Sequence, residues 1–138
     1  MKDHYILIYL HRIIKKLDKQ TTDIARVHGV TLSQFAVLEA LQHKGPMTVG
    51  QIKDAILSSD GTIPVVISNL CKAGLVQKMP DPHNRRRAIV SLTHDGLQCA
   101  RRISEENDCM ICREFSCWDD REKRDCIRFL RRFPLENR

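Results

Sequence analysis

Three consecutive arginines, Arg85–Arg87, are the side chains whose type and spacing most clearly indicate a chemical function in this sequence. They follow Asn84 and lie between two short apolar runs that are typical of β-strands, so they are expected at the tip of a hairpin. Adjacent guanidinium groups repel one another, although water and salt screen that repulsion on a free protein. Beside phosphates and a narrow minor groove of DNA the same cluster becomes favourable. The alternative is a solvated loop of charges.

Thiols are the second group of candidates, and five of the six cysteines fall within residues 99–126. Three interpretations stay open: small hydrophobic side chains of the core, a thiol switch, or a metal site. The two separated Cys-x-x-Cys pairs of a strong zinc site are not present, so we name no metal ligands and no cofactor. A reactive thiol needs a lowered pKa, for which nearby arginines supply positive charge. The possible thiol sensors are Cys71, Cys99, Cys109, Cys112, Cys117 and Cys126.

Other chemistry finds little support in the sequence. The six glycines do not cluster into a phosphate-binding loop, and no Ser/His/Asp motif stands in a recognisable context, so we predict that the protein is not an enzyme. The formal net charge of +6 and the pI of about 9.2 suit an anionic partner. The longest apolar run, Tyr5–Leu10, is too short to cross a membrane, and the N-terminal residues do not resemble a signal peptide. We therefore expect a cytoplasmic protein without a membrane partner.

The elements that must position these side chains follow from periodicity and from capping residues. Apolar residues at steps of three and four predict a long first helix over about residues 4–28. Two short helices joined by a polar turn follow later, which is the helix-turn-helix pattern. Proline is tolerated only in the first turn of a helix, so Pro64 places the start of the second of these near Gly61–Ile63. The remaining expected helices are 31–45, 48–57, 94–115 and 119–133, and the expected strands are 75–80 and 88–93.

The segment of residues 69–96 resembles the MarR family of winged helix-turn-helix transcriptional regulators, and the resemblance extends over nearly the whole chain. The family pattern runs without a gap through a leucine, a glycine-leucine-valine turn, Asp-Pro, paired arginines, a strand ending in Leu-Thr and a glycine. In this sequence these are Leu70, Gly74–Val76, Asp81–Pro82, Arg85–Arg86, Val90, Leu92–Thr93 and Gly96.

The resemblance implies a mainly α fold with a small β-hairpin wing. It predicts a single domain over residues 1–138, with the winged helix-turn-helix at about 31–96 and N- and C-terminal dimerisation helices at about 4–28 and 98–133. The implied function is sequence-specific binding of double-stranded DNA at a pseudo-palindromic operator, as a repressor released by a small-molecule or thiol-reactive effector. The alternative is a cysteine-rich metal-binding or protein-interaction module with weak DNA binding.

The resemblance also implies roles for individual residues. The wing tip of the family reaches the minor groove, and Arg86 aligns with its more constant arginine, which leaves Arg85 and Arg87 for phosphates. Asn84 stands where the family usually has an aspartate that holds this arginine by an ion pair. Pro64 and Val65 stand where the recognition helix usually has polar or basic residues, although Val65 can contact a thymine methyl. The polar candidates that remain on this helix are Thr62, Ser68, Asn69 and Lys72.

Overall fold

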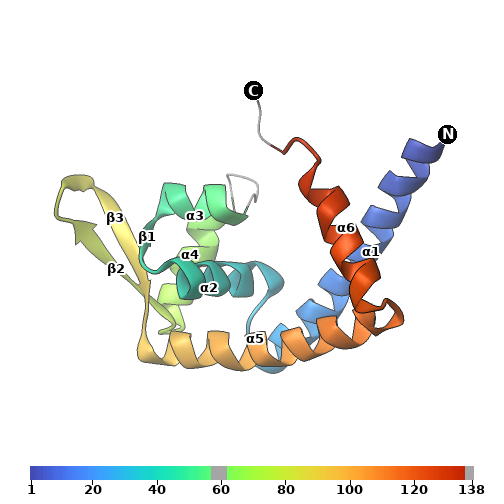
Figure 1. Ribbon diagram of the computed structural model, residues 1–138. Coiled ribbons are helices and arrows are strands. Elements are labelled where there is room, and N and C mark those ends of the chain that lie inside the picture. Colours follow the sequence, from blue (N-terminus) through green and yellow to red (C-terminus); the bar gives the residue numbers. More distant parts are fainter. Residues whose placement is uncertain (57–61, 136–138) are drawn as a thin grey trace. The chain divides into compact units, whose positions relative to one another are not determined.

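The computed structural model describes residues 1–56 and 62–135, and the chain divides into two compact units, Met1–Asn107 and Asp108–Arg138. The predicted fold class is confirmed, because helices predominate and an antiparallel wing follows the helix-turn-helix (Figure 1). In chain order the elements are α1 (Lys2–Val27), α2 (Leu32–Lys44), β1 (Met47–Thr48), α3 (Val49–Ile56), α4 (Ile63–Lys72), β2 (Val76–Asp81), β3 (Asn84–Leu92), α5 (His94–Glu114), the 3-10 helix η1 (Phe115–Cys117) and α6 (Asp120–Arg131).

The expected helix starts are confirmed at the capping residues. Thr31 accepts a hydrogen bond from the backbone N–H of Gln34 at 3.1 Å, and the Gln34 side chain accepts from the backbone N–H of Thr31 at 2.8 Å. Thr48 and Gln51 make the same reciprocal pair before α3, at 2.9 and 3.2 Å. Such pairs satisfy N–H groups that a helix cannot satisfy within itself, which is why α2 and α3 begin where they do.

Strand β1 was not expected, and it makes the wing a three-stranded sheet in the order β1-β3-β2. Met47 pairs with Val90 and Thr48 with Ile89, both antiparallel. Two residues are too few to show an alternating pattern, so periodicity could not reveal this strand. The consequence is that β3 is held between two strands at its C-terminal end, and this end fixes the base of the wing.

The hydrophobic core lies within the first unit, between the short helices, the base of the wing and the beginning of α5. Leu38, Ile52, Ile67 and Val90 have no exposed surface. Gly74 closes α4 at φ 75°, a left-handed conformation that glycine adopts without steric cost, and the chain turns there into β2. Helix α4 and the wing are therefore both anchored in one core.

The apolar stripe that predicts α1 from the sequence ends at Ile24 and Val27, and its last member is wrong. Val27 is 81% exposed, whereas Thr21 and Ala25 are buried. Thr21 donates a hydrogen bond from its hydroxyl to the side-chain oxygen of Asn107 on α5, at 2.7 Å. A buried polar group needs such a partner, so these two residues specify how α1 and α5 meet.

The second unit contains the end of α5, η1 and α6. Asp119 caps α6 by accepting from the backbone N–H of Glu122 at 2.8 Å. The apolar periodicity of the sequence predicts that α6 buries Ile127, Leu130 and Phe133, but in the single chain these side chains are 49%, 49% and 67% exposed. The sequence pattern shows that α6 has an apolar face, but it does not show what covers that face. None of the described helices is long and apolar enough to span a membrane.

Candidate DNA-binding surface

Helix α4 presents one buried and one exposed face. It begins at Ile63, with Thr62 at the N-cap and Pro64 in the first turn, so the predicted late start is confirmed. The sequence also offers Ser59 and Asp60 as caps for this helix, and both lie outside the described residues. Ile63, Ile67 and Leu70 point into the core and set the rotation of the helix. The residues left exposed are Thr62, Pro64, Val65, Asn69 and Lys72, and Ser68 is partly buried.

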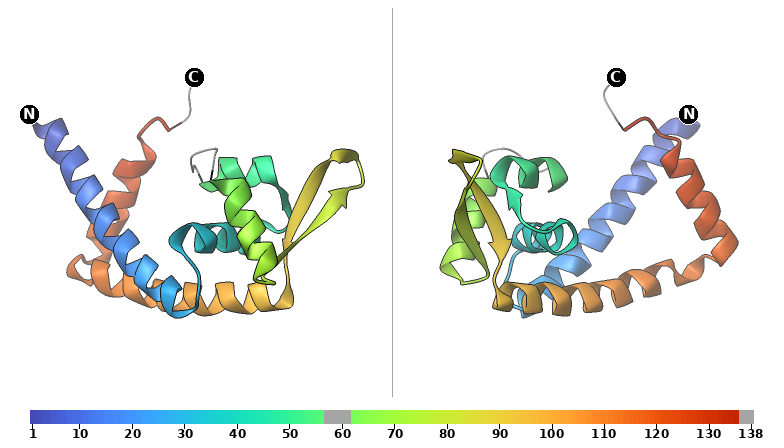
Figure 2. Two further views of the ribbon diagram at one scale, coloured as in Figure 1. Left: turned by 180° about the vertical axis from the view of Figure 1, so that it is seen from behind. Right: turned by 60° about the vertical axis from the view of Figure 1, so that its left-hand side comes forward.

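The wing extends away from the helices of the first unit, as the left-hand view of Figure 2 shows. Pro80 pairs with Ala88, but the next pair joins Asp81 to Asn84, so Arg85–Arg87 are extra residues on β3 with no partners across the hairpin. The arginines thus belong to an irregular strand rather than to the expected loop, and all three are exposed. Extra residues in one strand bend it and increase its local twist.

The side chain of Asn84 binds to the backbone of the wing. Its side-chain oxygen accepts a hydrogen bond from the backbone N–H of Arg86 at 3.1 Å. Asp81 likewise accepts from the backbone N–H of His83 at 2.9 Å, across the turn of the hairpin. Both bonds fix the path of the main chain, so Asn84 positions the residue that carries the guanidinium group and does not clamp the group itself.

An open hollow of about 570 Å³ separates the wing from α3. Arg86 and Arg87 line it on the side of β3, and Asp54 lines it from α3. The arginines therefore border a space that is wide enough to admit part of a ligand. The charge around that space is mainly positive, which suits an anion such as a phosphate group.

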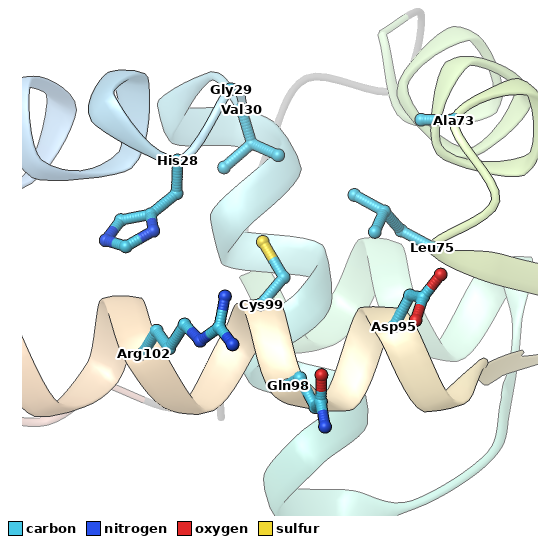
Figure 3. Close-up of a pocket in the computed structure, with 9 residues that line it drawn as sticks. All are labelled: His28, Gly29, Val30, Ala73, Leu75, Asp95, Gln98, Cys99 and Arg102. Atoms are coloured by element: carbon cyan, nitrogen blue, oxygen red, sulfur yellow. The ribbon is translucent and has the colours of Figure 1, made fainter.

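A second cavity, of about 390 Å³, lies between the end of α1, the turn after α4 and the beginning of α5. Figure 3 shows the Cys99 and Arg102 side chains rising from α5 toward His28 and Val30 at the end of α1. The His28 ring nitrogen Nε2 lies 2.9 Å from Glu106 Oε1. The sequence offered no signal for this cavity, because its walls come from segments far apart in the chain.

The six thiols differ in how far they are buried. Burial raises the pKa of the Cys99 thiol, and the nearby Arg102 charge opposes this only in part, so Cys99 is a poorer nucleophile than a free cysteine. Cys71 is partly buried and packs against the core. Cys109, Cys112 and Cys117 are exposed, and Cys126 is partly buried. Within residues 1–56 and 62–135, no three His, Cys, Asp or Glu side chains are grouped so that they could hold a metal ion.

A recognition helix anchored in a small helical core and followed by an antiparallel wing defines a winged helix-turn-helix protein. The sequence model of the MarR family matches residues 28–87. The transcriptional regulator MhqR of Bacillus subtilis is 28% identical over 130 residues, which are 94% of this chain and 90% of that protein. The chain is thus similar to the MarR family of DNA-binding transcriptional regulators in the segment 28–87, and to a transcriptional regulator over most of its length.

Two further comparisons agree with this similarity. The transcriptional repressor NicR of Pseudomonas putida is 37% identical over 83 residues, which are 55% of this chain and 52% of that protein. The crystal structure of a mutant MarR from E. coli complexed with operator DNA has the same fold, with a TM-score of 0.81 at 18% identity. That match covers 89% of each chain.

Proposed function

We propose that the protein is a homodimeric repressor that binds a pseudo-palindromic operator and releases it when an effector binds. The observation that carries this proposal is the exposed cluster Arg85–Arg87 on a wing whose base shares one core with α4. Support for repression comes from NicR, which is named as a repressor, and support for an operator comes from the E. coli MarR complex.

The two parts of the surface have different roles in this proposal. Helix α4 enters the major groove, where Asn69 and Lys72 offer hydrogen bonds and Val65 contacts a thymine methyl. On the wing, Arg86 enters the minor groove, while Arg85 and Arg87 meet phosphates. Because α4 exposes few polar side chains, much of the specificity comes from groove width and DNA shape.

Footprinting tests this proposal on duplex DNA from the region upstream of the protein's own coding sequence. We expect two protected half-sites about one helical turn apart, because a two-fold symmetric dimer presents two copies of α4. Transcription from the same DNA in vitro should fall when the protein is added. A single protected half-site, or a rise in transcription, would contradict the dimeric repressor.

Dimerisation rests on apolar surfaces that the single chain leaves uncovered. Along the first part of α1 they include Tyr5, Ile6, Tyr9 and Leu10, which are 61%, 59%, 59% and 41% exposed. Helix α6 exposes Ile127, Phe129 and Leu130 in the same way. Large exposed apolar patches on soluble proteins mark interaction sites, and a second copy of the chain offers matching surfaces.

Sedimentation equilibrium at micromolar concentration should therefore show a dimer of the 16.0 kDa chain. Leu10→Glu combined with Leu130→Glu should shift it to monomers, because charges would be buried without partners. Met79→Glu is the matched control, because Met79 is 57% exposed and belongs to β2 of the wing rather than to either helix. A parent protein that sediments only as a monomer would overturn the dimer and the two half-sites with it.

The cavity of Figure 3 is a candidate seat for a small-molecule effector. It combines apolar walls at Val30 and Leu75 with polar groups at His28 and Arg102. Pockets that bind small molecules commonly have this mixture. A ligand seated there would touch α5 and the turn that leaves α4, so it could bias the position of the recognition helix.

A further inference from the structure

An apolar groove of about 360 Å³ lies within the second unit, between the end of α5 and α6. It brings together two cysteines, Cys112 from α5 and Cys126 from α6. The spacing of its lining residues places them on one face of each helix, since they recur at steps of three and four. The lining residues are Ile111, Cys112, Phe115, Trp118, Lys123, Cys126, Ile127 and Leu130.

The thiols of this groove are accessible from solvent, because Cys112 is exposed and Cys126 is only partly buried. Two aromatic side chains, Phe115 and Trp118, also line the groove, and their rings are 5.3 Å apart. Lys123 is the charged member of the lining. Two thiols that line one apolar groove favour a ligand with an apolar body and a centre that bonds two sulfur atoms.

We propose that Cys112 and Cys126 form a dithiol site for trivalent organoarsenic compounds with an apolar substituent. An arsenoxide R–As=O reacts with both thiols, so that two As–S bonds replace the bonds from arsenic to oxygen and one water molecule leaves. The two thiol protons go to that water, and arsenic stays trivalent, so no oxidant or reductant is needed. The substituent R then packs against Phe115, Trp118 and Ile127, which removes apolar surface from water.

Occupation of the groove also covers Ile127 and Leu130, which the proposed dimer needs. The bound compound would therefore compete with the second copy of the chain and lower the affinity for the operator. This regulatory consequence rests on the proposed function, whereas the capture of the arsenical by the two thiols does not.

Phenylarsine oxide added to the reduced full-length protein tests the site. Native mass spectrometry should show one phenylarsenic group per chain, and the fluorescence of Trp118, the single tryptophan, should change on binding. Cys112→Ser and Cys126→Ser should each weaken binding at least tenfold, because one thiol cannot chelate the arsenic. Circular dichroism verifies that these conservative variants fold.

Cys109→Ser and Cys117→Ser are the matched controls, since both thiols are exposed and neither lines the groove. Both variants should bind as the parent does. Loss of binding in Cys109→Ser together with retention in Cys126→Ser would overturn the site, because the pair at Cys109 and Cys112 would then be the ligand. Equal binding by all four variants would also overturn it.

Sedimentation and footprinting of the arsenic-bound protein test the regulatory consequence separately. A smaller fraction of dimer and at least tenfold weaker operator binding would support it. In the Cys126→Ser control, the compound should change neither the dimer nor the operator binding. Capture through both thiols with unchanged dimer and footprint would overturn the consequence and leave the site intact. Failure of the untreated protein to give a footprint would instead count against the proposed function.

Discussion

Replacement of Arg86 by alanine is expected to weaken operator binding by roughly a hundredfold. A charge-assisted hydrogen bond contributes about 1.5–3 kcal/mol, and a dimer loses two of them, which makes about 3 kcal/mol at the lower end. At 1.4 kcal/mol per factor of ten, this corresponds to about two orders of magnitude in Kd. Fluorescence anisotropy with labelled operator would measure the change at fixed salt concentration.

Two other arginines provide the comparison for Arg86. Arg85→Ala should reduce the slope of log K against log salt by up to about 2, because each phosphate contact contributes about 0.9 and a dimer has two copies. Arg124→Ala removes the same charge from an exposed position on α6 and should leave both affinity and slope close to those of the parent. If Arg86→Ala binds as tightly as Arg124→Ala, the wing does not read the operator.

Gly96→Ala is expected to destabilise the fold by at least about 3 kcal/mol, at the upper end of what overpacking typically costs. A Cβ atom at position 96 would lie 1.8 Å from the carbonyl oxygen of Leu75 and 2.8 Å from its carbonyl carbon. Those atoms belong to the main chain, which cannot turn aside as a flexible side chain can. The first turn of α5 would have to move away from the beginning of the wing.

The surroundings of Gly96 explain why that movement is costly. The Leu75 carbonyl accepts a hydrogen bond from the backbone N–H of Thr93 at 3.1 Å. The Thr93 hydroxyl donates to the Gly74 carbonyl at 2.7 Å and accepts from the backbone N–H of Gly96 at 3.0 Å. A shift of α5 would break these hydrogen bonds and would disturb the packing of α5 against the core.

Gly50→Ala is the control for Gly96→Ala. Gly50 lies in α3, and nothing lies within 4 Å of the position that a methyl group would take there, so alanine should stabilise the helix by up to about 1 kcal/mol. Urea unfolding followed by circular dichroism would compare the two variants. Similar free energies of unfolding for both variants would contradict this prediction. They would show that the start of α5 accommodates a methyl group at position 96.

What could be predicted from the sequence was local in the chain. The start of α2 at Thr31, the late start of α4 imposed by Pro64 and the existence of the wing all depend on residues within a few positions of one another. The roles of Asn84 and Arg86 at DNA remain predictions. The backbone bond between these two residues was not expected, because side-chain direction in a hairpin depends on its register.

What could not be predicted depends on partners distant in sequence. Strand β1 is visible only through its pairing with β3, and the irregular pairing around the arginines depends on where Pro80 meets Ala88. The surface that covers the exposed apolar face of α6 could not be predicted either. An apolar periodicity indicates that something will be covered, but a single chain does not contain the surface that covers it.

The hydrogen bond between Thr21 and Asn107 has a consequence for how the chain folds during synthesis. It joins positions 86 residues apart, so most of the protein must leave the ribosome before it can form. The winged helix-turn-helix needs only the intervening chain, and closing its shorter loops costs less entropy. The contact between α1 and α5 therefore forms only after α5 has emerged, late in synthesis.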